Sequence, residues 1–242
     1  MKKTLFLAAL LSVSLYSCDS DDDASDNLSS TARYIKTVSV VNTDDGTNET
    51  LTVNYDADGR VSNVTDGFES STMVYNDNNE LITVTGESDP LSMSDLYQAP
   101  YDAYEYGDVL EYDSNGNPSV LQLFDISDED GSTIEYTGEI TYDAETNPFL
   151  HTLDKAGILD VLDNIDLNFS TTVTSQELVS AKLLLPSNNP KRMVVKTLDD
   201  VIVADVVANY VYNADGYPTS ATFTTTTDED VSISSATYTY LP

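Results

Sequence analysis

The sequence predicts an all-β fold, an antiparallel meander of hairpins with one short helix near residues 153–165. Two observations predict the meander: a unit made of a tyrosine, an Asp or Asn and a turn recurs five times, and runs of alternating apolar and polar residues flank it. Alternation with a period of two is typical of a strand that buries one face. A third observation, helical spacing of apolar residues between residues 153 and 167, predicts the helix.

The five units supply the expected hairpin turns. Tight turns between strands need positive φ angles, which Gly and Asn tolerate, and Asp-Gly and Asn-Gly pairs follow three of the tyrosines. We expect the tyrosines to point inward from strand ends with hydrogen-bonded hydroxyls, in a domain of about 10–14 strands. The units are LTVNYDADGRVSNVT (51–65), STMVYNDNNELITVT (71–85), DVLEYDSNGNPSVLQ (108–122), GEITYDAETNPFLHT (138–152) and ANYVYNADGYPTSAT (208–222), with Tyr55, Tyr75, Tyr112, Tyr142 and Tyr212 as their tyrosines.

Residues 87–106 lack clean periodicity. A long segment without regular structure is uncommon in a compact domain, and it is usually functional or disordered. This one is rich in tyrosine, an aromatic residue with a polar tip that suits contact with a ligand. The candidate ligand-binding residues are Tyr97, Tyr101, Tyr104 and Tyr106.

The N-terminus has the layout of an export signal. Lys2 and Lys3 precede an apolar run, residues 5–15, that is shorter than the roughly 20 residues needed to span a bilayer. Leu15-Tyr16-Ser17-Cys18 resembles a bacterial lipobox. The resemblance implies cleavage before Cys18 and acylation of this only cysteine, so that residues 1–17 are a lipoprotein signal peptide. A secreted protein with a stray thiol is the alternative, and neither reading leaves a disulfide in the folded part.

An acidic run follows the cysteine. Residues 18–32 are expected to form a flexible tether, because like charges repel one another and remain hydrated, and residues 33–242 to form a single β-rich domain. The run also resembles the export signal of surface lipoproteins in Bacteroidota, which implies an outer-membrane protein on the cell surface. In enterobacteria, an aspartate after the cysteine would instead suggest retention in the inner membrane. The export-signal residues are Asp19, Asp21, Asp22 and Asp23.

Charge excludes some partners. The formal net charge is −32, which argues against nucleic acid, because phosphate contacts need a basic face. Between Arg60 and Lys155 there is no basic residue, although 21 of the 42 acidic residues lie there. Such a surface is either simply solvated or attracts cations and basic partners.

The sequence offers little chemistry for catalysis. His151 is the only histidine, and no catalytic triad, zinc cluster or nucleotide motif is present. Asn54, Asp56 and Asp58 before Gly59 resemble the start of a calcium loop, but Thr65 stands where the loop needs a bidentate acid. These three residues are weak calcium candidates, and no other metal or cofactor is expected.

Several segments resemble one family. Asn188-Asn189-Pro190 with the following KRMV, NYVYNADGYPTSATF (209–223) and ATYTYL (236–241) are similar to the C-terminal half of uncharacterised Bacteroidota lipoproteins. The five tyrosine units also resemble the tyrosine-aspartate repeat of bacterial surface proteins. The family resemblance implies a porin-like domain, either a curved sheet or barrel-like. It implies no known activity and no catalytic residue.

The sequence leaves four candidate functions. The first, which we favour, is a non-enzymatic, lipid-anchored surface lipoprotein that binds an unknown protein or glycan partner through the tyrosine-rich acidic segment 87–113. The alternatives are a structural envelope lipoprotein that faces the periplasm, or a weak calcium-dependent glycan binder. An enzyme is the least favoured class, because the side chains for common mechanisms are missing.

Overall fold

The fold was analysed in a computed structural model, which describes residues 32–43, 46–86, 89–97, 100–103, 107–126, 131–170, 177–228 and 230–242. These residues form mostly antiparallel sheet with a few short helices, which confirms the predicted all-β class. None of the helices within these ranges is long and apolar enough to cross a membrane.

The described residues contain sixteen strands and four short helical segments. The strands are β1 (Ile35–Asn42), β2 (Asn48–Tyr55), β3 (Val61–Thr65), β4 (Ser70–Tyr75), β5 (Leu81–Thr85), β6 (Leu91–Ser92), β7 (Tyr101–Asp102), β8 (Val109–Tyr112), β9 (Pro118–Ile126), β10 (Thr133–Thr146), β11 (Asp166–Asn168), β12 (Leu178–Ser180), β13 (Asn188–Thr197), β14 (Ile202–Tyr212), β15 (Pro218–Thr227) and β16 (Val231–Tyr240). The helical segments are α2 (Met93–Leu96), α3 (Leu150–Lys155), α4 (Ile158–Asp163) and the 3₁₀ turn η2 (Ala181–Leu184).

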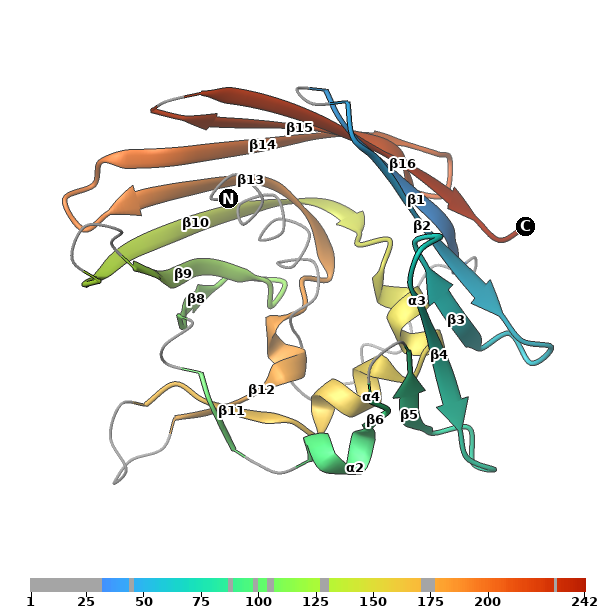
Figure 1. Cartoon of the computed structure of the whole chain (residues 1–242). Coiled ribbons are helices and arrows are strands. Elements are labelled where there is room, and N and C mark those ends of the chain that lie inside the picture. Colours follow the sequence, from blue (N-terminus) through green and yellow to red (C-terminus); the bar gives the residue numbers. More distant parts are fainter. Residues whose placement is uncertain are drawn as a thin grey trace.

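The main sheet has 13 strands in the order β6-β5-β4-β3-β2-β1-β16-β15-β14-β13-β10-β9-β8. The first and last strands of the domain, β1 and β16, therefore pair in the middle of the sheet, and its two edges come from the middle of the chain. Figure 1 shows the sheet as a strongly curved arch, with α2, α3 and α4 at its open side. A second sheet, β12-β11-β7, also lies there, and its β11–β7 pair is parallel, unlike the expected meander.

The main core lies on the sheet's concave face. Strand residues such as Ile140, Val195 and Ala236 are buried there, and Phe149 and Ile158 from the helical segment pack against them. Because alternate residues of a strand point to opposite faces, the alternation read from the sequence corresponds to this one-sided burial.

Four of the five tyrosine units form the same hairpin turn. In each, the Asp or Asn after the tyrosine accepts hydrogen bonds on Oδ1 from the backbone N–H groups two and four residues later, at 2.8–3.0 Å. The residue three positions on has a positive φ, and at Asn79 an asparagine takes the place of glycine. The four capping residues are Asp56, Asn76, Asp113 and Asn213.

The tyrosine hydroxyls fasten neighbouring strand ends together. Tyr55, Tyr75 and Tyr142 donate to the carbonyls of Ile35, Val61 and Pro118 at 2.6–2.7 Å, and each acceptor is the first residue of the adjacent strand. Tyr212 donates to the Asp143 carboxylate instead. The predicted inward, hydrogen-bonded tyrosine is confirmed at these four positions, whereas Tyr112 on edge strand β8 is exposed.

Three finer predictions differ from the structure. The unit 138–152 forms no hairpin: β10 runs on to Thr146, no residue between Asp143 and the start of α3 at Leu150 has a positive φ, and a helix follows in place of a strand. The expected single helix is divided in two by Gly157, which is left-handed at φ +70°. Sixteen strands exceed the expected number because several have only two to four residues.

Candidate functional site

An open groove of about 650 Å³ lies at the β6 edge of the main sheet. We call it the edge groove. Strands β5 and β6, helix α2 and helix α4 contribute to it, and they come from two parts of the chain far apart in sequence. It is lined by Glu80, Leu81, Ile82, Thr83, Ser92, Met93, Ser94, Tyr97, Gly157, Asp160, Val161, Asp163 and Asn164.

A small apolar cluster holds the groove's elements together. Leu81 of β5, Met93 of α2 and Val161 of α4 are all buried and pack against one another. Gly157, between the two helices, approaches β5 closely: a Cβ atom there would lie 3.2 Å from the Leu81 Cβ. Because Gly157 is left-handed and needs no Cβ room, α4 can turn back onto the strand.

The groove's electrostatic character is acidic. Glu80 comes from the β4–β5 turn, and Asp160 and Asp163 come from α4. Among the described residues that line the groove, none is Lys, Arg, His or Cys. One of these acids is already paired, because Lys182 Nζ lies 3.5 Å from Asp163 Oδ2, and Arg60 pairs with Asp56 outside the groove.

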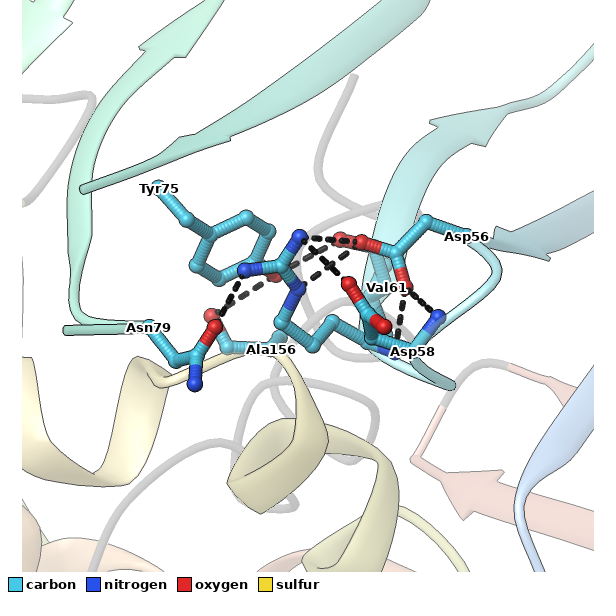
Figure 2. A network of polar contacts seen from close by, with 7 residues as sticks. Asp56, Asp58, Val61, Tyr75, Asn79 and Ala156 are labelled. Atoms are coloured by element: carbon cyan, nitrogen blue, oxygen red, sulfur yellow. Dashed lines mark hydrogen bonds and ion pairs between the residues drawn. The ribbon is translucent and has the colours of Figure 1, made fainter. Parts of the chain in front are cut away.

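A polar network centred on Arg60 lies next to the groove, where Arg60 contacts Asn79, the residue before Glu80. The guanidinium donates from Nε to Asp56 Oδ2 at 2.8 Å and from a terminal nitrogen to Asn79 Oδ1 at 2.7 Å. It also lies 4.6 Å from the centre of the Tyr75 ring, a favourable cation–π distance. Figure 2 shows this network, in which the Tyr75 hydroxyl also reaches the Ala156 carbonyl at 3.3 Å. The network therefore ties two hairpin turns to the end of α3.

Only one of the four candidate tyrosines is seen in the groove. Tyr97 lines it, and its side chain is exposed. Tyr101 is also exposed, but it belongs to β7 and its hydroxyl donates to the Asp95 carbonyl at 3.4 Å. Tyr104 and Tyr106 lie outside the described residues.

The calcium candidates do not converge. Asp56 uses Oδ1 for the backbone of its own turn and Oδ2 for Arg60, whose guanidinium lowers the pKa of the Asp56 carboxyl. Asn54 is directed at Asn63, with Nδ2 donating to Oδ1 at 3.2 Å. Asp58 is 3.5 Å from Arg60. Here a guanidinium occupies the position beside the carboxylates, and calcium binding remains a prediction without support from this geometry.

His151 lies in α3. It is buried beside the Tyr217 ring, at 6.0 Å between ring centres, and burial lowers its pKa. Across the described ranges, no three His, Cys, Asp or Glu side chains gather to hold a metal ion. The lipidation site Cys18 and the export-signal residues Asp19, Asp21, Asp22 and Asp23 lie outside the described residues.

Sequence reasoning missed most of the edge groove. Tyr97 was singled out from the sequence, but the three acids Glu80, Asp160 and Asp163 were not. One signal was available, because a glycine in a helical pattern lowers helix propensity and marks a break at Gly157. The meeting of these residues depends on how α4 packs against β5, which no local pattern encodes.

Comparison with known proteins gives a likeness in fold. No protein-family model and no curated protein matches the sequence. Among solved structures, a porin-like protein from Bacteroides vulgatus ATCC 8482 is similar over 87% of this chain and 99% of that chain, with 14% identity and a TM-score of 0.42. A porin-like protein from Bacteroides uniformis ATCC 8492 is similar over 86% and 98%, with 12% identity and a TM-score of 0.40. These distant likenesses carry no argument about function.

Proposed function

We propose that this protein is a lipid-anchored outer-membrane lipoprotein, displayed on the cell surface, that acts as a non-enzymatic binding module through the edge groove. The observation that carries the proposal is the groove itself, a cavity of about 650 Å³ in which Tyr97 lies among acidic and hydroxyl side chains. A concave site with an aromatic face and a few polar groups is the usual form of a binding site.

The location rests on the N-terminal sequence. The lipobox-like Leu15-Tyr16-Ser17-Cys18 supports an acyl anchor, and the acidic run after it supports export to the surface. The rival is a structural envelope lipoprotein that faces the periplasm and whose acids serve only solubility. The two differ in whether the domain is reachable from outside the cell.

Protease added to intact cells tests the location. The wild-type domain should be removed, and replacing Asp21, Asp22 and Asp23 with Ala should protect it, because the export signal is lost. A Cys18→Ala chain should carry no lipid by mass spectrometry. If the wild-type domain resists protease on intact cells and is cut only after lysis, the surface location is wrong.

The groove's role is tested with two soluble probes, a basic peptide and the neutral sugar chitohexaose. Tyr97→Ala should weaken whichever probe binds the full-length chain, because the ring lines the groove. Tyr101→Ala is the matched control, since Tyr101 is similarly exposed but does not line the groove. Equal effects of the two substitutions would contradict a binding role for the groove.

A further inference from the structure

The floor of the edge groove is an incompletely paired strand. β6 pairs with β5 only at Thr83 and Val84, and then the chain leaves the sheet to form α2. The first two residues of β5, Leu81 and Ile82, therefore have no strand neighbour on this side, within the described sheet that ends at β6. Both residues line the groove. An uncovered strand edge offers backbone N–H and C=O groups to another extended chain.

The register of β4 and β5 shifts next to this edge. Tyr75 pairs with Leu81 and Val74 pairs with Thr83, so Ile82 is an extra residue that has no partner on β4. A bulge of this kind increases local twist and redirects a side chain. Ile82 is 41% exposed, although Leu81 beside it is buried. Ile82 is thus exposed to solvent, whereas Leu81 packs in the apolar cluster with Met93 and Val161.

The groove's charges are spread along its length. Glu80 and the two α4 aspartates come from different elements, and within the described residues no three acids gather tightly enough to hold a metal ion. Separated carboxylates suit a ligand with several separated positive charges better than a single ion. The exposed Tyr97 ring adds a surface on which an ammonium or guanidinium group can lie.

We propose that the edge groove binds an extended, lysine- or arginine-containing peptide segment of another protein, which adds as a strand beside Leu81–Ile82. This inference rests on the proposed binding function and names its partner class. Main-chain hydrogen bonds to the strand edge hold the segment, as in other cases of strand addition. The basic side chains of the segment pair with Glu80 and Asp160. The flexible Met93 side chain adds an apolar contact.

The binding experiment must separate this groove from the general attraction of a −32 chain for any polycation. The probe is a labelled peptide of alternating lysine and threonine, titrated by fluorescence anisotropy against the full-length chain. A matched peptide carries the same charges but has N-methyl groups on alternate amides, so it cannot pair as a strand. The groove variant is Glu80→Gln with Asp160→Asn. The control is Asp199→Asn, which removes an exposed charge in the β13–β14 turn, outside the groove.

We expect the plain peptide to bind wild-type and Asp199→Asn chains equally, and the groove variant about tenfold or more weakly. The N-methylated peptide should bind the wild-type chain about tenfold or more weakly than the plain peptide. The inference is overturned if the N-methylated peptide binds as tightly, or if Asp199→Asn weakens binding as much as the groove variant.

The chitohexaose probe distinguishes this inference from the proposed function. If chitohexaose binds and Tyr97→Ala weakens it, while the basic peptide does not bind, strand addition is wrong and the groove remains a binding site. If Tyr97→Ala changes the binding of neither probe, or neither probe binds at all, the result counts against both proposals. Circular dichroism melting of each variant ensures that a loss of binding is not a loss of fold.

Discussion

At the scale of single residues, the tyrosine hydroxyls are the most regular feature of the molecule. Two tyrosines other than the five that define the predicted units also donate to backbone carbonyls: Tyr210 to Pro190 and Tyr240 to Pro218, at 3.1 and 2.7 Å. The units were predictable because each turn bonds to itself over two to four residues. Tyr210 and Tyr240 were not, because no Asp or Asn directly follows them to mark a turn.

Tyr142→Phe should lower the free energy of unfolding by about 1 kcal/mol. The substitution keeps the ring but removes the donor to the Pro118 carbonyl at 2.7 Å, which leaves that carbonyl without the bond in a part-buried place. Urea unfolding measures the change. Tyr101→Phe is the control, because its hydroxyl makes only a long 3.4 Å bond at an exposed site. An equal decrease in the free energy of unfolding of the two variants would show that the Tyr142 hydrogen bond does not stabilise the fold.

Stability should fall at alkaline pH. Burial raises the pKa of Tyr75 to about 12, and burial also raises the pKa of Tyr142 and Tyr240 above the ordinary value of about 10. These pKa values are higher in the folded than in the unfolded chain. The contribution of the protonated tyrosines to the free energy of unfolding is therefore complete below pH 10. It is lost as pH rises through the folded values. Urea unfolding at pH 8 to 12 should show this decline, and a flat profile above pH 10 would contradict it.

At the scale of elements, the helical segment shows what periodicity can and cannot predict. Apolar spacing placed one helix between residues 153 and 165, and the structure has α3 ending at Lys155 and α4 from Ile158 to Asp163 in that stretch. Spacing could not predict that α4 turns back onto β5, because that depends on the absence of a Cβ at Gly157 where the backbone meets Leu81. The same turn brings Asp160 and Val161 to the edge groove.

Gly157→Ala should destabilise the protein by more than Gly59→Ala. Both positions have positive φ, +70° and +78°, so both substitutions carry the left-handed cost of about 1–2 kcal/mol. A Cβ at position 59 meets nothing within 4 Å, whereas one at position 157 meets Leu81 at 3.2 Å. The difference in unfolding free energy therefore measures the packing of the helix turn against β5. An equal decrease in the free energy of unfolding of the two variants would mean that β5 can move away from a Cβ at position 157 without destabilising the fold.

At the scale of the whole molecule, the first and last strands of the domain pair with each other in the middle of the main sheet. β1 pairs with β2 on one side and β16 on the other, and the Leu241 N–H donates to the Tyr34 carbonyl at 2.8 Å. Two groups of hairpins, one from each end of the chain, are joined at this seam. Within the described sheet, one group ends at edge strand β6 and the other at edge strand β8, and the edge groove lies at β6.

Removal of residues 231–242 should abolish cooperative unfolding. The deletion takes away β16, which pairs with both β1 and β15, and so separates the sheet into two parts. Urea unfolding followed by circular dichroism should show a broad, non-cooperative change. Deletion of Pro242 alone is the control and should leave the transition intact. A sharp transition in the longer deletion would show that the seam is dispensable.

The sequence by itself determined the strands, the Tyr-Asx turns and the position of the helical segment. These depend on side-chain alternation and on hydrogen bonds within a few residues, so the local order of amino acids is sufficient for them. Only the tertiary structure decided the β1–β16 seam, the turn of α4 onto β5 and the edge groove. Each joins residues far apart in the chain, and alternation that specifies which face of a strand is buried does not specify which strand it will pair with. Glu80, Asp160 and Asp163 line one groove only because those contacts bring β5 and α4 together.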